Sequence, residues 1–256
     1  MKIVVKIGTS TLTHASGCVN IRRIEKLVKV ISDIRNAGHE VILVSSGAIA
    51  MGVGKLNLPA RPQDIAEKQA AAAVGQCELM YTYDKLFSEY NQTVAQILLT
   101  ADDLKVPDRH EKFEDTMSCL LAWRTLPIIN ENDTVSTDEI KIGDNDTLGA
   151  IVAESVRADL LVLLSDIDGL YDSDPHRNPD AHLIPEVREI TDDILALGGG
   201  AGSARGTGGM ATKLQAAKIA TGAGCDMLIM NGDDPEKLYC ILDGTPVGTR
   251  FYAKER

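Results

Sequence analysis

The chain has 256 residues, of which 44% are hydrophobic, and a formal net charge of −11. A chain of this length and composition can bury a full core as one large domain or two small ones. The negative charge argues against nucleic acid and anionic membranes, and no segment approaches the roughly 18 apolar residues of a membrane span. We therefore expect neither nucleic acid nor a membrane as the main partner.

Cysteine usage and the start of the chain indicate a cytoplasmic location. The five cysteines are odd in number, and their spacing suggests no metal site, so we expect reduced thiols. The segment Met1–Gly8 is too short and too strand-like for a signal peptide.

Short apolar runs rich in Val, Ile and Leu alternate with helical patterns along the chain. The predicted strands are Ile3–Ile7, Val41–Val44, Val94–Leu98, Leu126–Ile129, Leu160–Leu164 and Met227–Met230. The predicted helices are Arg22–Asn36, Gln63–Tyr90, Arg109–Trp123, Asp146–Arg157 and one that has Lys213 in its first turn and ends near Ala223. Continuous apolar strands between helices predict a mostly parallel sheet that is covered on both faces. We expect an α/β fold, a three-layer αβα sandwich, in a single domain over residues 1–256.

Small, polar or charged residues follow most of the predicted strands. These strand ends are Gly8-Thr9-Ser10, Ser45-Ser46-Gly47-Ala48, Asn130-Glu131-Asn132-Asp133, Ser165-Asp166 and Asn231-Gly232. In open parallel sheets the ligand crevice lies beyond the carboxyl ends of the strands. Polar residues are common in turns, so any one of these strand ends carries little information. The five together, with predicted helix starts at Gly47 and Gly209, favour a ligand site at this edge of the sheet.

The segment Gly206–Lys213 has the composition of a phosphate-binding loop. Its glycines let the backbone approach an anion, and the helix that follows directs unpaired N–H groups and its positive dipole end toward them. It is not a Walker loop, because no Gly-Lys-Ser/Thr triplet occurs. A dinucleotide site would need a strand directly before the glycines, and a flexible linker would not need Lys213.

These motifs resemble those of the amino acid kinase family, and the resemblance runs from Lys2 to about Thr249. It rests on residues 5–10, 45–50, 130–133 with 143–146, 165–171 with 174–175, and 206–213. Within the family the chain is most similar to members that phosphorylate the γ-carboxylate of glutamate in proline synthesis. The resemblance implies the amino acid kinase fold, ATP and L-glutamate as substrates, and Mg²⁺ on the ATP phosphates. Many bacterial members carry a further C-terminal PUA domain, which we expect this chain to lack.

The resemblance also implies catalytic roles for four residues. Lys6 and Lys213 would stabilise the transferred phosphoryl group from two sides, and Asp146 would orient both ammonium groups. Asp144 would act on the same lysines or on the metal, and we predict no direct protein ligand of the metal beyond this. The nucleophile is a carboxylate with an ordinary pKa of about 4.3, so no general base is required. An acidic helix N-terminus is the alternative reading of the two aspartates.

The implied binding residues form two sets. For ATP they are Lys6, Gly8, Thr9, Ser165, Asp166, Tyr171, Thr207, Gly208, Gly209, Met210, Ala211, Thr212 and Lys213. For glutamate, Asp133 and Asn145 would accept from the α-ammonium, while Ser46 and the helix start at Gly47 would donate to the α-carboxylate.

A pocket that recognises both an ammonium and a carboxylate group suits an amino acid better than the substrates of two relatives, uridylate kinase and isopentenyl phosphate kinase. Aspartokinase stays an alternative, because one methylene is worth only about 1–3 kcal/mol of discrimination. A non-catalytic nucleotide-binding regulator is a second alternative. We further expect a homo-oligomer and proline as a feedback inhibitor.

Overall fold

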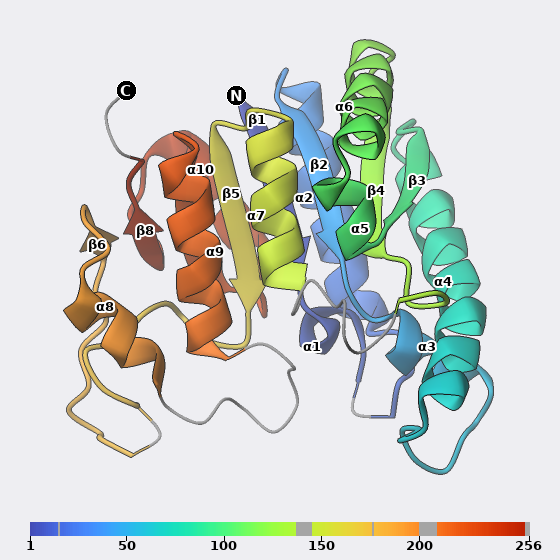
Figure 1. Ribbon diagram of the computed structural model, residues 1–256, viewed down its shortest axis with the longest axis horizontal. Coiled ribbons are helices and arrows are strands. Elements are labelled where there is room, and N and C mark those ends of the chain that lie inside the picture. The colour runs from blue at the N-terminus through green and yellow to red at the C-terminus, as the bar shows by residue number, and fades with distance from the viewer. Residues whose placement is uncertain (15, 137–144, 176, 200–208, 254–256) are drawn as a thin grey trace.

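The computed structural model describes residues 1–14, 16–136, 145–175, 177–199 and 209–253, and its centre is one mostly parallel sheet (Figure 1). Eight strands of the described residues form it, in the order β3-β4-β2-β1-β5-β7-β8-β6. Their bounds are β1 Lys2–Ile7, β2 Glu40–Ser45, β3 Val94–Leu99, β4 Leu126–Glu131, β5 Leu160–Ser165, β6 Glu186–Val187, β7 Asp226–Asn231 and β8 Thr249–Phe251.

All six strands predicted from the sequence are confirmed, and each is one or two residues longer than predicted. Every neighbouring pair of strands is parallel except β7 and β8, which are antiparallel. The sequence did not predict β6 and β8, because strands of two and three residues are too short to show a hydrophobic period.

Helices cover both faces of the sheet, which confirms the three-layer αβα sandwich. The α-helices are α1 Thr9–Leu12, α2 Ile21–Asn36, α3 Ala48–Lys55, α4 Ile65–Ser88, α5 Ala101–Lys105, α6 Pro107–Ala122, α7 Asn145–Ser155, α8 Asp192–Ala196, α9 Met210–Gly222 and α10 Tyr239–Asp243. Two 3₁₀ turns, η1 Leu197–Gly199 and η2 Pro235–Leu238, complete the described elements. None of these helices combines the length and apolarity needed to cross a membrane.

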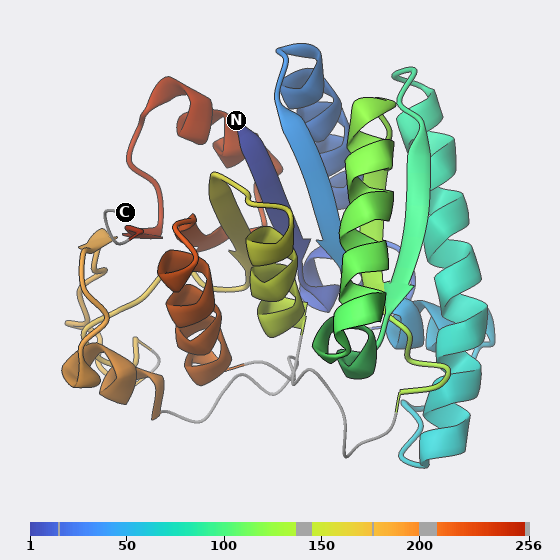
Figure 2. The same ribbon diagram turned by 45° about the horizontal axis from the view of Figure 1, so that its top comes forward.

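The sheet separates two hydrophobic layers. Helices α2 and α4 pack on one face, and α6, α7 and α9 pack on the other (Figures 1 and 2). Along β1, Ile3, Val5 and Ile7 belong to the first layer and Val4 to the second. Because side chains alternate along a strand, Lys6 shares the side of Val4. A lysine in this buried strand therefore points toward α7 and α9.

Helices α3 and α4 cross with their backbones in contact. A Cβ atom on Gly75 of α4 would lie 1.7 Å from the carbonyl oxygen of Ala48 and 2.4 Å from the backbone nitrogen of Gly52. Ala48 is the first residue of α3 and follows Gly47, whose φ of 99° is in the left-handed region that glycine tolerates. The crossing therefore determines where the loop after β2 lies.

We expect Gly75→Ala to destabilise the protein strongly, because the added methyl group would overlap two backbone atoms and push α3 away. The loss should exceed about 2 kcal/mol in urea unfolding followed by circular dichroism. Gly222→Ala is the matched control: this helical glycine has no atom within 4 Å of the added Cβ. A Gly75→Ala variant as stable as the Gly222→Ala variant would contradict the close crossing.

Candidate functional site

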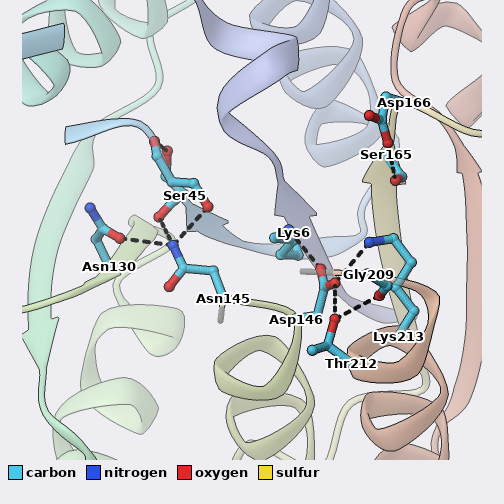
Figure 3. Close-up of polar contacts among 11 residues, drawn as sticks. Lys6, Ser45, Asn130, Asn145, Asp146, Ser165, Asp166, Gly209, Thr212 and Lys213 are labelled. Carbon is cyan, nitrogen blue, oxygen red and sulfur yellow. Dashed lines mark hydrogen bonds and ion pairs between the residues drawn. The ribbon is translucent and has the colours of Figure 1, made fainter. Parts of the chain in front are cut away.

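Three charged side chains meet beyond the carboxyl end of β1. Lys6 comes from β1, Asp146 from the first turn of α7, and Lys213 from the first turn of α9 (Figure 3). The Lys6 Nζ atom lies 2.6 Å from Asp146 Oδ1, and the Lys213 Nζ atom lies 3.0 Å from Asp146 Oδ2. All three residues are buried, and Asp146 is fully so. One carboxylate therefore holds two ammonium groups, one on each oxygen.

The electrostatics of this cluster leave it positively charged. Burial by itself would raise the pKa of Asp146, but the charges and hydrogen bonds of Lys6 and Lys213 lower it to about 2. Asp146 is therefore ionised at neutral pH, and within the described residues the two lysines have no other ion pair. Two positive charges and one negative charge leave a net charge of +1 in a buried place. Such a site favours an anion.

Backbone groups around the cluster also suit an anion. A Cβ atom on Gly8 would lie 3.9 Å from Lys6 Nζ, so the missing side chain leaves space beside this ammonium group. Helix α9 begins after Gly209, and the Thr212 hydroxyl donates to the Gly209 carbonyl oxygen at 2.8 Å. The N–H groups of the first helical turn lack intrahelical partners. The cluster is thus bordered by a glycine and by the start of a helix.

A second, uncharged cluster lies beyond the ends of β2 and β4. The side-chain amide nitrogen of Asn145 donates to the Ser45 carbonyl oxygen at 2.9 Å and to the Ser46 hydroxyl oxygen at 2.7 Å. It also lies 3.1 Å from the side-chain oxygen of Asn130 (Figure 3). Since Ser46 accepts from Asn145, its own hydroxyl proton remains available to a ligand. The side-chain oxygen of Asn145 has no hydrogen-bond partner within the described part of the chain.

The first turn of α7 joins the two clusters. Asn145 and Asp146 are consecutive, so their Cα atoms are about 3.8 Å apart. Asn145 reaches toward β2, and Asp146 reaches toward β1 and α9. The polar and the cationic cluster therefore lie side by side at one edge of the sheet.

The remaining residues predicted for ATP lie nearer to β5 and β7. Ser165 ends β5, and its hydroxyl donates to Asp166 Oδ1 at 3.1 Å. The Tyr171 hydroxyl donates to Asp168 Oδ2 at 3.4 Å, and Asn231 Nδ2 donates to Asp168 Oδ1 at 3.0 Å. These contacts link the loop after β5 to the end of β7.

Three of the predicted site residues, Asp144, Thr207 and Gly208, lie outside the described residues. Asp133 lies half-buried in the turn after β4, and Met210 and Ala211 open α9. The sequence did not indicate Gln76 or Tyr83 of α4, which contact Asn130 and Ser45 respectively. No group of three or more His, Cys, Asp or Glu side chains in the described ranges could hold a metal ion.

The chain belongs to the amino acid kinase family, a class of phosphotransferases, whose sequence profile matches residues 1–231. It is 57% identical to a glutamate 5-kinase of Clostridium perfringens, over 99% of this chain and 96% of that protein. A glutamate 5-kinase of Clostridium tetani is 56% identical, over 98% of this chain and 94% of that protein.

Solved structures show the same fold at lower identity. The isopentenyl phosphate kinase of T. acidophilum superimposes with a TM-score of 0.69 at 20% identity, over 98% of this chain and 100% of that chain. The carbamate kinase of Giardia lamblia gives a TM-score of 0.68 at 18% identity, over 99% of this chain and 98% of that chain. These likenesses confirm the expected fold class.

The lowered pKa of Asp146 predicts a loss of stability in acid. The carboxyl pKa is about 2 in the folded protein and 3.8 ordinarily, so its contribution is present above pH 4 and disappears as the pH falls through 2. We expect Asp146→Asn to lower the free energy of unfolding at pH 7 by about 3–5 kcal/mol, because two buried ammonium groups lose their partner.

Urea unfolding of both proteins at several pH values checks this. The difference between wild type and Asp146→Asn should shrink by about 2 kcal/mol between pH 4 and pH 2. A difference that stays constant over this range would mean that the Asp146 carboxylate is not stabilised by the lysines.

Proposed function

We propose that the protein is an ATP-dependent kinase that phosphorylates the γ-carboxylate of L-glutamate, giving γ-glutamyl phosphate and ADP, the first step of proline biosynthesis. One observation carries the proposal: consecutive residues of α7 take part in a cationic cluster and in a polar cluster. A reaction between a polyanion and an amino acid needs both clusters side by side. The two clostridial relatives, named glutamate 5-kinases at over 50% identity, support the same substrates.

The chemical difficulty of this reaction is repulsion. The attacking γ-carboxylate is already ionised at neutral pH, so it needs no base, but it approaches a negatively charged phosphate. Phosphoryl transfer of this kind is catalysed by positioning and by cations aimed at the transferred group. The net charge of +1 on the buried cluster meets this need.

In our proposal Lys6 and Lys213 stabilise the transferred phosphoryl group, and Asp146 positions them. A free lysine side chain samples many rotamers, whereas here each ammonium group is held on one oxygen of a single carboxylate. The ion pairs thus lower the entropy that the lysines would lose in the transition state. The space beside Gly8 and the start of α9 at Gly209 would accommodate phosphate oxygens, with Thr9 and residues 207–212 as further ATP contacts.

The polar cluster would bind the amino-acid end of glutamate. The side-chain oxygen of Asn145 would accept from the α-ammonium, together with Asp133. The Ser46 hydroxyl and the start of α3 after Gly47 would donate to the α-carboxylate. The adenosine would lie over the loop that carries Ser165, Asp166 and Tyr171.

Magnesium would enter with ATP. Mg²⁺ in kinases is held mainly by substrate phosphates with one or two carboxylates and several waters, and it neutralises charge on the phosphates. Asp144 is the carboxylate that we propose to act on this metal or on the two lysines.

The substrate is tested by trapping the acyl phosphate with hydroxylamine. With MgATP we expect a hydroxamate from L-glutamate and far less from L-aspartate or N-acetyl-L-glutamate. N-acetyl-L-glutamate has no free ammonium group to donate to Asp133 and Asn145. L-aspartate has one, but its side chain is one methylene shorter, so its carboxylate would lie farther from the transferred phosphate. A stronger signal from L-aspartate would favour the aspartokinase alternative. No product with any of the three would favour a non-catalytic nucleotide-binding protein.

A lysine substitution tests the cationic cluster. Lys213→Met keeps the bulk of the side-chain stem and leaves Asp146 paired with Lys6, so the fold should survive. We expect kcat to fall at least about 100-fold, the size of the loss when one charge contact to the transition state is removed. Lys218→Met, an exposed lysine on the same helix, is the matched control and should keep normal turnover. Near-normal kcat in Lys213→Met would remove this residue from the site.

We also propose a cytoplasmic homo-oligomer that proline inhibits at the glutamate site. Proline has the α-carboxylate and a cationic nitrogen but lacks the γ-carboxylate, so it could bind by the same two groups and offer nothing to phosphorylate. Initial rates over a grid of proline and glutamate concentrations test this, since inhibition that high glutamate cannot relieve would exclude a shared site.

A further inference from the structure

Gln76 lies behind the polar cluster, on the buried side of α4. It is 8% exposed, and its side-chain oxygen accepts a hydrogen bond from the side-chain nitrogen of Asn130 at 2.9 Å. Asn130 is 2% exposed and precedes Glu131, the last residue of β4. Asn130 is in turn 3.1 Å from the side-chain nitrogen of Asn145. Three side-chain amides thus form a chain from α4 to the first turn of α7.

Two backbone groups determine the direction of this chain. The oxygen and nitrogen of a side-chain amide are similar in shape, so hydrogen-bond partners decide its orientation. The backbone N–H of Glu131 can only donate, and it lies 2.9 Å from the side-chain oxygen of Asn130. The backbone carbonyl of Ser45 can only accept, and it lies 2.9 Å from the side-chain nitrogen of Asn145. The NH₂ group of Asn145 therefore faces the side-chain oxygen of Asn130 and shares its two hydrogens among three acceptors, and Asn130 donates to Gln76.

The acceptor on Gln76 is what satisfies Asn130 in this orientation. Without it, a donor in a nearly fully buried residue would lack a partner, which is costly. Turning the Asn130 amide over would not help, because its NH₂ group would then face the N–H of Glu131 and the NH₂ group of Asn145. An Asn130 side chain without this acceptor would therefore be expected to move in search of another partner for its NH₂ group, and Asn145 would then lose its acceptor on Asn130. The side chain of Asn145 could then shift away from Ser46.

We propose that Gln76 is a positioning residue of the glutamate site, which acts through Asn130 to hold Asn145 and Ser46 in their binding orientation. This inference rests on the proposed function. Within the described ranges of the chain, Gln76 makes no hydrogen bond to Lys6, Asp146 or Lys213, so its effect should fall on glutamate and not on ATP. A residue of α4 would thereby control affinity for a substrate that binds at the ends of β2 and β4.

The first test compares Gln76→Met with wild type in steady-state kinetics. Methionine has a similar length but offers no comparable acceptor, so we expect KM for glutamate to rise about tenfold or more. KM for ATP should change little, while the unpaired donor on Asn130 should lower the thermal midpoint modestly. Thr82→Val is the matched control, because it also removes one side-chain hydrogen bond of α4, from the Thr82 hydroxyl to the Glu78 carbonyl. It should leave both KM values unchanged.

The second test is a double-mutant cycle with Asn130→Ala. If Gln76 acts through Asn130, Gln76→Met should raise KM for glutamate in the wild-type background and add little in the Asn130→Ala background. Equal effects in the two backgrounds, or parallel changes in both KM values and stability, would overturn the proposal. If Gln76→Met does not fold, Gln76→Asn replaces it in both tests, because asparagine keeps an amide but is one methylene shorter.

The wild-type protein separates this inference from the proposed function. If it releases no ADP in response to glutamate, the proposed function fails. If wild type is active and Gln76→Met has the same KM for glutamate, only the positioning role of Gln76 fails.

Discussion

Two buried ammonium groups share one buried carboxylate, and the arrangement of the site depends on this contact. Burying ions is costly, and a cluster of this kind persists only when the surrounding elements hold it in place. Lys6 is held by β1, Asp146 by α7 and Lys213 by α9, so three elements must meet correctly for the charges to pair. Among the described residues one positive charge of this cluster has no opposite charge beside it, and such an excess favours an anionic ligand. A balanced pair would have been easier to bury but would attract an anion less.

The same contact explains why the start of α7 is placed as it is. At Gly149 this helix faces the stem of Lys6, and an added Cβ would come into van der Waals contact with the Lys6 Cβ atom at 3.4 Å. With the helix at this depth, Asp146 reaches both lysines, and Asn145 reaches Ser45 and Ser46. The distance between the cationic and the polar cluster is thus set by one peptide unit and does not depend on a flexible loop.

Helix α4 packs on the face of the sheet opposite to α7 and supports the polar cluster from that face (Figure 2). Its Gly75 lies against the start of α3, its Gln76 contacts Asn130, and its Tyr83 hydroxyl lies 3.0 Å from the Ser45 hydroxyl. Burial raises the pKa of Tyr83, so this hydroxyl stays protonated and serves as a neutral hydrogen-bonding group. These contacts span about two turns of one helix. The loop after β2 and the end of β4 are therefore positioned relative to each other by a shared support.

The amino-acid sequence by itself determined the elements and the chemistry at their ends. Periodic apolar runs identified the six long strands and the long helices, and a lysine inside an apolar strand before Gly8 indicated a functional cation, because these signals are local. Tertiary structure decided which side chains meet. Gln76 and Asn130 are 54 residues apart, and Asp146 and Lys213 are 67 apart. Such pairings arise from strand alternation and from the α3–α4 crossing, which depend on the whole packed sheet and leave no pattern in neighbouring residues.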